Sequence, residues 1–309
     1  MKVGRREIDV SNRDKVFFPD SGVTKGDLVD YYHRIADTFL PHARDRPVSM
    51  ERFPDGIAGD SFFQKDVPDY FPGWIRRVEI EKENGTLHQL VIDDAATLVY
   101  LADQGCVTPH VWLSRSEHIR RPDRLIVDFD PPGDDPDAYF DEVRWAARTT
   151  RSLLEELDLV PFVQTSGSRG LHIHVPLNGD EGFDTVRHFA MDLADLLARR
   201  HPERLTTAHR KAKREGRIFL DVLRNAYAQT SVAPYAVRAR AGAPVATPLA
   251  WDELDRSGLG PVSYTVENIF RRLGQRDDPW SGMGRHGRSL SGPRQALNEL
   301  LGEAGLDPR

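Results

Sequence analysis

A run of apolar and aromatic residues from Arg124 to Pro132, reading RLIVDFDPP, is the clearest element that the hydrophobic pattern predicts. Branched and aromatic side chains dominate this run, and a Pro-Pro-Gly sequence at 131–133 ends it. Such a pattern is typical of a buried strand that ends in a turn. Because side chains alternate between the two faces of a strand, Asp128 and Asp130 are expected to project from the same face.

Other segments have the period of amphipathic helices. Apolar residues recur every three or four positions in the ranges 28–39, 93–102, 136–157, 183–200, 265–273 and 295–301. Thr24 followed by Asp27 is typical of a helix N-terminus and predicts where the first of these helices begins. The Asn84-Gly85 pair, between two strand-like stretches, predicts a β-hairpin.

Composition restricts the class of protein. The 309 residues are 39% hydrophobic and 29% charged, as in soluble globular proteins, and no apolar run is long enough to cross a bilayer. The N-terminus lacks the apolar core of a secretory signal, so a cytoplasmic protein is expected. The single cysteine, Cys106, excludes an internal disulfide and a multi-cysteine metal site. The net charge of −6 argues against a nucleic-acid partner, but residues 199–217 hold eight Lys or Arg against two Glu.

Three aspartates are the strongest candidates for chemistry. Two carboxylates at the end of a buried strand repel each other, and a hard divalent cation would relieve that repulsion. The alternative is that one of Asp128 and Asp130 caps the next segment while the other binds the turn. A second apolar strand, IFLDVLRN, adds Asp221. Three carboxylates from two strands are what two divalent ions need at a phosphoryl-transfer site.

The stretch 159–177, reading LVPFVQTSGSRGLHIHVPL, predicts two strands joined by a Ser/Gly turn. Glycines, backbone amides, two serine hydroxyls and an arginine suit a triphosphate. His172 and His174 share a face of the second strand; the alternative is a hairpin with half-buried histidines, and a zinc site would need a third ligand. Arg238 and Arg240 are expected to alternate on a strand face and to suit the outer phosphates of a nucleotide.

Three groups of residues are candidates for contact with nucleic acid. Lys15 and Lys25 flank a helix start and could anchor a phosphate, or they are ordinary solvated lysines. Phe62 and Phe63 could stack on bases, or one of them belongs to the core. The basic segment 199–217 is expected to be a phosphate-facing loop, with a solvated charged surface as the alternative.

These motifs together resemble a known family. In order, DFDPP, TSGSRGLHIHVPL, FLDVLRN and PYAVRARAGAPVATPLAWDEL are similar to the polymerase domain of bacterial ligase D, in the archaeo-eukaryotic primase superfamily. DKVFFPDSGVTKGDLVDYY and FFQKD match as well, so the resemblance covers about residues 5–275. No ligase or nuclease module fits in 309 residues, so a stand-alone member is expected.

The resemblance implies an α/β (α+β) fold with a primase-like core of two packed, mixed or antiparallel sheets flanked by helices. It implies a catalytic domain over residues 1–275, in which 1–100 contact the DNA end and template and 101–275 hold metal and nucleotide. Residues 276–309 would then be a C-terminal tail. The implied activity is template-directed addition of nucleotides to a primer at gaps or broken ends, with a preference for ribonucleotides.

The resemblance also assigns roles to individual residues. The metal-binding catalytic carboxylates would be Asp128, Asp130 and Asp221. The nucleotide-binding residues would be His110, Ser166, Ser168, Arg169, His172, Arg238 and Arg240. The DNA-binding residues would be Lys15, Lys25, Phe62 and Phe63. Lys65, beside the aromatic pair, and Arg210, Lys211, Lys213 and Arg214 of the basic segment are DNA-binding candidates by their charge. Arg169 stands where many members carry lysine, and the surroundings of His110 differ from the commoner form.

Cofactors and partners follow from the same resemblance. Two Mn²⁺ or Mg²⁺ ions are implied, with NTP or dNTP and a gapped or broken duplex bearing a 5′-phosphate. A separate DNA ligase and the bacterial Ku protein are expected partners, membranes are not, and the expected location is the nucleoid in the cytoplasm. Two other functions remain open: a catalytically silent module that binds and bridges DNA ends, and a metal-dependent phosphohydrolase.

Overall fold

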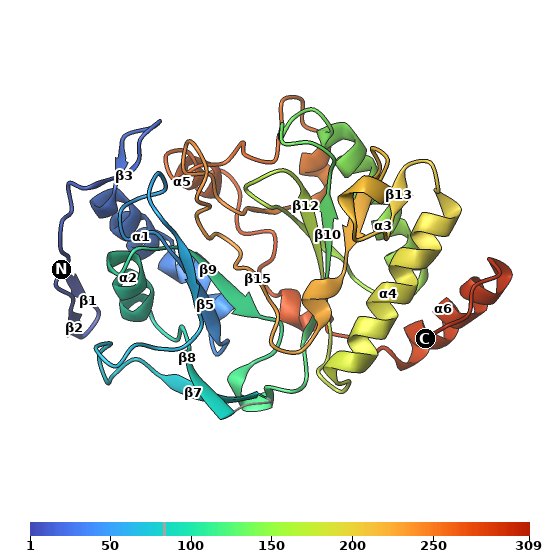
Figure 1. Cartoon of the computed structure of the whole chain (residues 1–309), viewed down its shortest axis with the longest axis horizontal. Coiled ribbons are helices and arrows are strands. Elements are labelled where there is room, and N and C mark those ends of the chain that lie inside the picture. The colour runs from blue at the N-terminus through green and yellow to red at the C-terminus, as the bar shows by residue number, and fades with distance from the viewer. Residues whose placement is uncertain (83–84) are drawn as a thin grey trace. The chain divides into compact units, whose positions relative to one another are not determined.

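The computed structural model describes residues 1–82 and 85–309. The chain forms two compact units, each assembled from segments that lie far apart in the sequence (Figure 1). Unit 1 contains residues 1–117, 230–247 and 264–278, and unit 2 contains residues 118–229, 248–263 and 279–309. The predicted α/β fold with antiparallel and mixed sheets is confirmed.

Unit 1 is built around a four-stranded antiparallel sheet. The strand order is β15-β9-β5-β6, comprising β15 (Thr230–Val232), β9 (Cys106–Trp112), β5 (Val48–Arg52) and β6 (Phe62–Gln64). The sheet's central strands, β5 and β9, are mostly buried, whereas β6 is an edge strand whose residues are exposed or half-buried. An edge strand with exposed side chains is available to other molecules.

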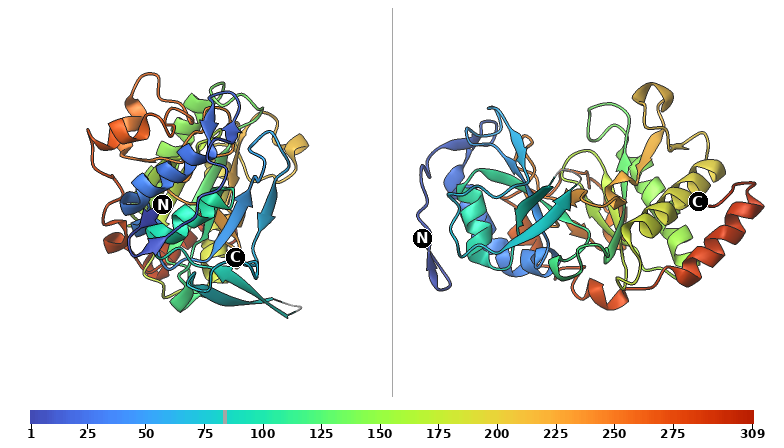
Figure 2. Two further views of the ribbon diagram at one scale, coloured as in Figure 1. Left: turned by 90° about the vertical axis from the view of Figure 1, so that its left-hand side faces the viewer. Right: turned by 60° about the horizontal axis from the view of Figure 1, so that its bottom comes forward.

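Helices and short ribbons complete unit 1. The helices are α1 (Lys25–Ala43), α2 (Ala95–Asp103), α5 (Ile269–Leu273) and the short 3₁₀ turn η1 (Ser116–His118). The two-stranded ribbons pair β1 (Lys2–Val3) with β2 (Arg6–Glu7), β3 (Val16–Phe18) with β4 (Val23–Thr24), and β7 (Arg77–Lys82) with β8 (Gly85–Leu90). Thr24 and Asp27 form the predicted capping box at the start of α1. The antiparallel ribbon of β7 and β8 agrees with the predicted hairpin, although Asn84 lies outside the described residues (Figure 2).

Unit 2 holds the larger sheet. Its order is β13-β14-β10-β12-β11-β16, comprising β13 (Leu205–Thr206), β14 (Ile218–Asp221), β10 (Arg124–Asp130), β12 (Leu171–Pro176), β11 (Phe162–Thr165) and β16 (Pro248–Leu249). Its strands run antiparallel except for β13 and β14, which are parallel. The remaining elements are α3 (Phe140–Glu156), α4 (Phe183–Arg200), α6 (Ser291–Glu303), η2 (Lys211–Lys213), η3 (Leu223–Asn225), η4 (Trp251–Asp255) and η5 (Met283–His286).

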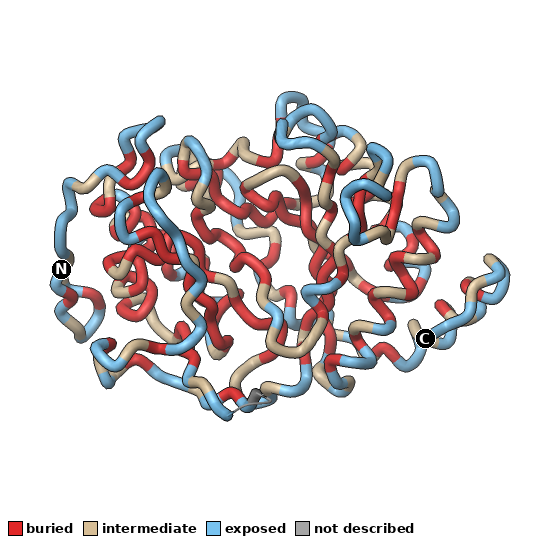
Figure 3. Tube along the Cα trace, viewed as in Figure 1, coloured by how far each residue is buried: buried red, intermediate tan, exposed pale blue. Residues whose placement is uncertain are grey.

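The predicted strand at 124–132 is the central strand β10, and its continuous apolar run reflects burial. Leu125, Ile126, Val127 and Phe129 are at most 1% exposed, and α3 and α4 both pack against this sheet. Residues 124–127 are buried in succession, so both faces are covered there and apolar residues are needed at successive positions, whereas Asp128 and Asp130 are half-buried. Figure 3 shows the buried positions concentrated in such strands and the exposed ones in connecting loops.

The predicted helices form, but several have other limits: the one expected over 265–273 begins at Ile269, and the one expected over 295–301 covers Ser291–Glu303. The helix expected from 136 begins at Phe140, because the Asp135 carboxylate accepts a hydrogen bond from the N–H of Asp137 at 3.0 Å and keeps this stretch in a turn. The C-terminal segment contributes to unit 2 through Trp280, which is 1% exposed and donates to the carbonyl of Val163. None of the helices within the described ranges combines the length and the apolar composition needed to cross a membrane.

Candidate active site

The three aspartates lie on neighbouring strands of unit 2. Asp128 on β10 pairs in register with Asp221 on β14, so the two side chains share a face of the sheet with Asp130. Burial raises the pKa of Asp221, and the charges of Asp128 and Asp130 raise it further against the opposing hydrogen bond from the N–H of Leu223. Uncompensated negative charge of this kind is what a bound cation would relieve.

Two arginines hold the carboxylate of Asp130. Arg169 donates from Nη2 to Oδ1 at 2.6 Å, and Arg214 donates from Nη1 to Oδ2 at 2.6 Å. Arg169 is anchored further by the carbonyl of Gly133 at 2.5 Å. Across the described parts of the chain, no three His, Cys, Asp or Glu side chains are placed to hold a metal ion as they stand. Oxygen donors of the right kind are present, but an ion that uses Asp130 must displace these arginine contacts.

His172 on β12 lies beside Asp128. It pairs in register with Asp128, and its Nε2 lies 3.3 Å from Oδ1 of that residue, while its Nδ1 lies 3.3 Å from the amide of Gln164. His172 is 5% exposed, and its ring is held between Asp128 and Gln164. His174 is also buried, with its ring centroid 4.8 Å from that of Trp280. His172 thus faces the carboxylates, whereas His174 packs in the core.

The Ser/Gly turn is built by Ser166. Its hydroxyl oxygen accepts hydrogen bonds from the N–H groups of Ser168 at 3.1 Å and Gly170 at 3.0 Å, and its own N–H donates to the carbonyl of Gly170 at 2.9 Å. Gly167 has φ +64°, which suits glycine. The turn places Arg169 beside Asp130. Whether Ser166 and Ser168 bind a nucleotide stays a prediction.

Gly170→Ala is expected to destabilise the protein by about 2 kcal/mol, because the added methyl group would overlap the carbonyl oxygen of Phe129. Chemical denaturation with urea measures this loss. Gly302→Ala is a matched control, since its methyl group would meet open space on helix α6 and should not destabilise. Equal stability of Gly170→Ala and the natural protein would contradict the close approach of the turn to β10.

The basic segment 199–217 divides into two groups of side chains. Arg204 bonds Glu142 and stacks on Trp145, and Arg214 binds Asp130, so these cations have structural partners. The exposed cations around η2 are Arg210, Lys211 and Lys213. The segment is therefore only in part a surface for phosphate.

In unit 1, a cavity of about 180 Å³ brings Lys15, Lys25 and Arg52 together. The ammonium of Lys15 donates to Asp55 at 2.5 Å and to the carbonyl of Pro54 at 2.9 Å. Lys25 is 5% exposed and pairs with Asp103 at 2.6 Å, so it is not a solvated lysine. Arg52 was not identified from the sequence; it ends the strand 48–52, which already contains Ser49 and Glu51, so no local pattern singles it out. The cluster of three cations suits an anion such as a phosphate.

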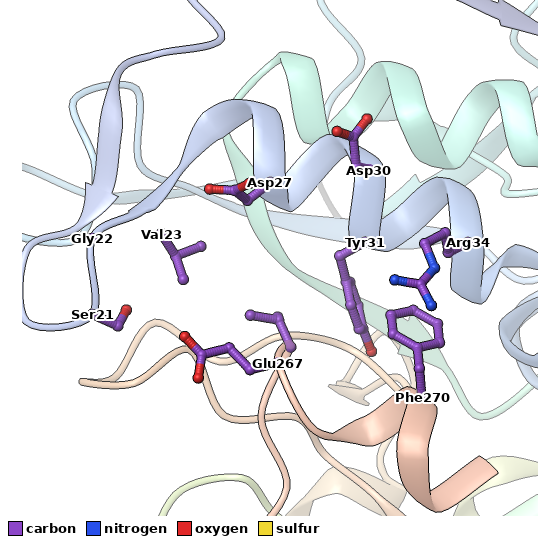
Figure 4. Close-up of a pocket in the computed structure, with 10 residues that line it drawn as sticks. Ser21, Gly22, Val23, Asp27, Asp30, Tyr31, Arg34, Glu267 and Phe270 are labelled. Atoms are coloured by element: carbon purple, nitrogen blue, oxygen red, sulfur yellow. The ribbon is translucent and has the colours of Figure 1, made fainter. Parts of the chain in front are cut away.

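A second cavity of unit 1, of about 330 Å³, is lined by acidic residues (Figure 4). Asp27 belongs to the capping box, Asp30 is paired with Arg13 at 2.6 Å, and Glu267 points toward the same space. Three carboxylates against one cation, Arg34, make this cavity unsuited to phosphate. The cavity lined by lysines is therefore the better candidate for an anion.

Both candidate stacking residues are exposed on the edge strand β6. Phe62 is 45% exposed and Phe63 is 58% exposed, so the alternative that one of them is buried in the core is wrong. Arg52 lies over the ring of Phe62, and Phe63 meets the ring of His110 edge to face at 5.3 Å. Lys65, which follows β6, is exposed as well. Exposed aromatic rings beside cations are typical of surfaces on which bases stack.

His110 is joined to a carboxylate that was not identified from the sequence. Its Nε2 lies 3.3 Å from Oε2 of Glu51 on the adjacent strand β5, two residues beyond Ser49, which is the partner of His110 in register. Burial favours the neutral form of Glu51, but the hydrogen bond from His110 and the charges of His110 and Arg238 outweigh it and lower the pKa of Glu51. His110, Glu51 and Arg238 therefore form one charged cluster in unit 1.

The expectation that Arg238 and Arg240 alternate on a strand face is wrong. Val237 forms an isolated bridge with Val245, and neither of the two arginines that follow belongs to a strand. The N–H of Arg238 donates to the carbonyl of Pro244 at 2.7 Å, and that of Arg240 donates to the carbonyl of Arg238 at 2.8 Å. The pairing of Val237 with Val245 cannot continue as a β-ladder, because Pro244 lacks an N–H and because Gly242 and Ala243 have positive φ.

Comparison with known proteins identifies the family. Residues 24–280 match the family described as the LigD, primase-polymerase domain. The chain is 36% identical over 296 residues to the multifunctional non-homologous end joining protein LigD of Pseudomonas aeruginosa, covering 95% of this chain and 34% of that protein. It is 29% identical over 275 residues to the bifunctional non-homologous end joining protein LigD of Bacillus subtilis, covering 89% of this chain and 44% of that protein. The chain thus spans less than half of the length of these relatives.

A solved structure agrees with this match. The polymerase domain of Mycobacterium tuberculosis ligase D, in complex with DNA, superimposes with a TM-score of 0.84 at 29% identity, covering 92% of this chain and 100% of that one. Primase-polymerases are nucleotidyltransferases, so the prediction that this chain is an enzyme of that class is confirmed. As its motifs predict, the chain belongs to the LigD primase-polymerase domain family.

Proposed function

We propose that the protein extends a primer strand at gaps or broken DNA ends by template-directed transfer of nucleotides, with a preference for ribonucleotides. The observation that carries this proposal is the cluster of Asp128, Asp130 and Asp221 on adjacent strands, beside the turn that holds Arg169. In the reaction, the 3′-oxygen of the primer forms a bond to the α-phosphorus, and the bond from that phosphorus to pyrophosphate breaks.

Asp128, Asp130 and Asp221 would hold divalent metal ions. Bound Mn²⁺ or Mg²⁺ ions, two in the proposed mechanism, would lower the pKa of the primer 3′-hydroxyl and neutralise the triphosphate. His172 keeps the Asp128 carboxylate oriented through its Nε2. Arg169 and Arg214, which neutralise Asp130, are placed to exchange that carboxylate for phosphate oxygens when substrate binds.

Other residues of the nucleotide site act on the triphosphate. Ser166 shapes the turn that presents the hydroxyl of Ser168, and a hydroxyl donor suits a phosphate oxygen. Arg238, Arg240 and His110 supply further cationic or donor groups for the outer phosphates. We assign to the exposed Arg210, Lys211 and Lys213 a looser contact with the DNA backbone.

Unit 1 would recognise the DNA end. The cavity with Lys15, Lys25 and Arg52 suits a 5′-phosphate, because three cations and one carboxylate, Asp103, line a space of about 180 Å³. Phe62 and Phe63 would stack on template bases, with Lys65 near the backbone. The structural neighbour from Mycobacterium tuberculosis was solved with DNA, which supports DNA as the partner of this chain too.

Phe63→Ala and Phe62→Ala are each expected to weaken binding of a gapped duplex by about 1 kcal/mol, since a stacked base is lost. Stability should change by less than about 0.5 kcal/mol, because both rings are exposed. Fluorescence anisotropy with a labelled duplex measures the affinity. Tyr139→Ala, at an exposed aromatic residue of unit 2, is the control. Unchanged affinity in both phenylalanine variants would rule out their role in stacking.

The proposed role in the cell is end joining. Relatives of this chain are named for non-homologous end joining, and a separate DNA ligase and the bacterial Ku protein would be its partners at the nucleoid. We further propose a catalytic domain over 1–275 and a C-terminal tail over 276–309. Within the catalytic domain, residues 1–100 would contact DNA, and residues 101–275 would hold the metal and the nucleotide.

Primer extension on gapped duplexes tests the proposal. Each template base is offered all four ribonucleotides and all four deoxyribonucleotides, with manganese or magnesium, and with a 5′-phosphate or a 5′-hydroxyl at the gap. We expect addition of the complementary nucleotide, faster with ribonucleotides and with the 5′-phosphate. If duplexes bind but no nucleotide is added, the protein is a catalytically silent module for DNA ends.

A further inference from the structure

The backbone that leads into Arg238 is held by buried hydroxyl groups from other elements of unit 1. The hydroxyl of Tyr32 on α1 accepts a hydrogen bond from the N–H of Val237 at 3.0 Å and donates to the carbonyl of Val107 at 2.6 Å. The hydroxyl of Thr108 on β9 donates to the carbonyl of Val237 at 2.7 Å. Both polar groups of Val237, the residue just before Arg238, are therefore bound by side chains.

The residue at the start of this stretch is in an unusual conformation. Tyr235 has φ +65°, a left-handed conformation that is costly for a residue with a side chain, yet Tyr235 is fully buried. Tyr31 donates to its carbonyl at 2.7 Å, and Figure 4 shows Tyr31 projecting from α1 beside Phe270. The hydroxyl of Tyr235 donates to Asp278 at 2.7 Å, and the other oxygen of Asp278 lies 2.7 Å from Nε2 of His42.

These contacts hold one strained conformation in place. Burial, and then the charge of Asp278, raise the pKa of Tyr235, so its hydroxyl remains a donor at neutral pH. Contacts that over-determine a strained backbone are typical of functional sites, where the strain sets a geometry that function needs. The stretch held by these contacts leads directly to Arg238, which is half-buried, whereas Arg240 is exposed.

We propose that Tyr32 and Thr108 are positioning residues that hold the backbone at Val237, so that the guanidinium of Arg238 is pre-organised for the triphosphate of the incoming nucleotide. The inference rests on the proposed function, in which Arg238 contacts that triphosphate. An arginine has a long flexible side chain, and a rigid backbone at its base reduces the freedom that binding must remove. The charge of Arg238 also lowers the pKa of Glu51, so the two side chains attract each other.

The test removes single hydroxyl groups while it keeps side-chain size. Tyr32→Phe and Thr108→Val lose the contacts with Val237, whereas Thr108→Ser keeps its hydroxyl. Tyr100→Phe is the control, because the Tyr100 hydroxyl makes no hydrogen bond to any residue that the structure describes. The readouts are KM for the nucleotide, kcat, the Kd of inorganic tripolyphosphate from calorimetry, and the thermal midpoint of unfolding.

We expect KM and the tripolyphosphate Kd to rise about tenfold in Tyr32→Phe and in Thr108→Val, with kcat within about twofold. Thr108→Ser and Tyr100→Phe should resemble the natural protein. If Tyr32→Phe does not fold, the Thr108→Val and Thr108→Ser pair gives the same comparison. KM and Kd that are unchanged in Thr108→Val, or that rise equally in Thr108→Ser, would overturn the proposal.

A double-mutant cycle separates positioning from general loosening of the structure. If Tyr32 and Thr108 act through Arg238, then Tyr32→Phe should change KM by less than about twofold when Arg238 is already alanine. The same rise in both backgrounds would overturn the proposal. If Arg238→Ala binds tripolyphosphate with the Kd of the natural protein, the assigned role of Arg238 is refuted, and the inference with it. Impairment in Arg238→Ala but not in the two hydroxyl variants would refute the inference alone.

Discussion

Asp128→Ala is expected to lower the rate of nucleotide addition by more than about 10³-fold, because metal-dependent stabilisation of a phosphoryl-transfer transition state contributes several kcal/mol. Asp128 lies between His172 on one neighbouring strand and Asp221 on the other, so no other side chain can take its position. Initial rates of primer extension at saturating nucleotide and DNA measure the loss.

The fold should survive this change. Loss of the Asp128 charge lowers the pKa of Asp221 toward its ordinary value. The variant of similar size, Asp128→Asn, is therefore expected to be as stable as the natural protein or more stable. Thermal unfolding checks this. Asp184→Ala, an exposed aspartate at the start of α4, is the matched control and should keep full activity. Substantial extension by Asp128→Ala would refute the assignment of Asp128 as a catalytic carboxylate.

Lys25→Met is expected to weaken binding of a duplex with a 5′-phosphate by about 2 kcal/mol, or about 30-fold in Kd, because a buried cationic donor is lost from the cavity. Binding of the same duplex with a 5′-hydroxyl should change little. The ratio of the two dissociation constants, from fluorescence anisotropy at one salt concentration, is the quantity to compare.

A double variant separates two effects of Lys25→Met: the lost attraction between Lys25 and the 5′-phosphate, and the new repulsion between the phosphate and the unpaired Asp103 carboxylate. Lys25→Met leaves the carboxylate of Asp103 buried without its ion-pair partner, so the double variant Lys25→Met/Asp103→Asn should recover part of the affinity but not all of it. Lys2→Met removes an exposed lysine of β1 and should have no effect. If the ratio of the two dissociation constants in Lys25→Met equals that of the natural protein, the cavity does not bind the 5′-phosphate.

The sequence predicts most of the fold because local patterns determine it. The apolar run at 124–132 is the central strand β10, and the helix predicted over 183–200 is α4 with the same limits. Thr24 and Asp27 mark the start of α1, since a capping box depends only on residues three positions apart. These features rest on periodicity or on neighbours in the chain, which a single sequence contains.

The parts that the sequence does not predict depend on residues far apart in the chain. Arg214 and Asp130 are 84 positions apart, and nothing in the basic run distinguishes Arg214 from its exposed neighbours. Lys25 is buried because Asp103 lies against it, a pairing that sequence spacing does not reveal. The alternation of residues at Arg238 and Arg240 predicts a strand, because an irregular segment can have the same alternation.

Transfer of label from a nucleotide to a primer tests the central claim most directly. The nucleotide carries the label at its α-phosphate, the duplex has a gap with a 5′-phosphate, and the products are separated by length. We predict that label appears in primers lengthened by the complementary nucleotide, and that Asp128→Asn abolishes this product. Label that remains in the nucleotide, or that is released as free monophosphate while the duplex stays bound, would contradict the account.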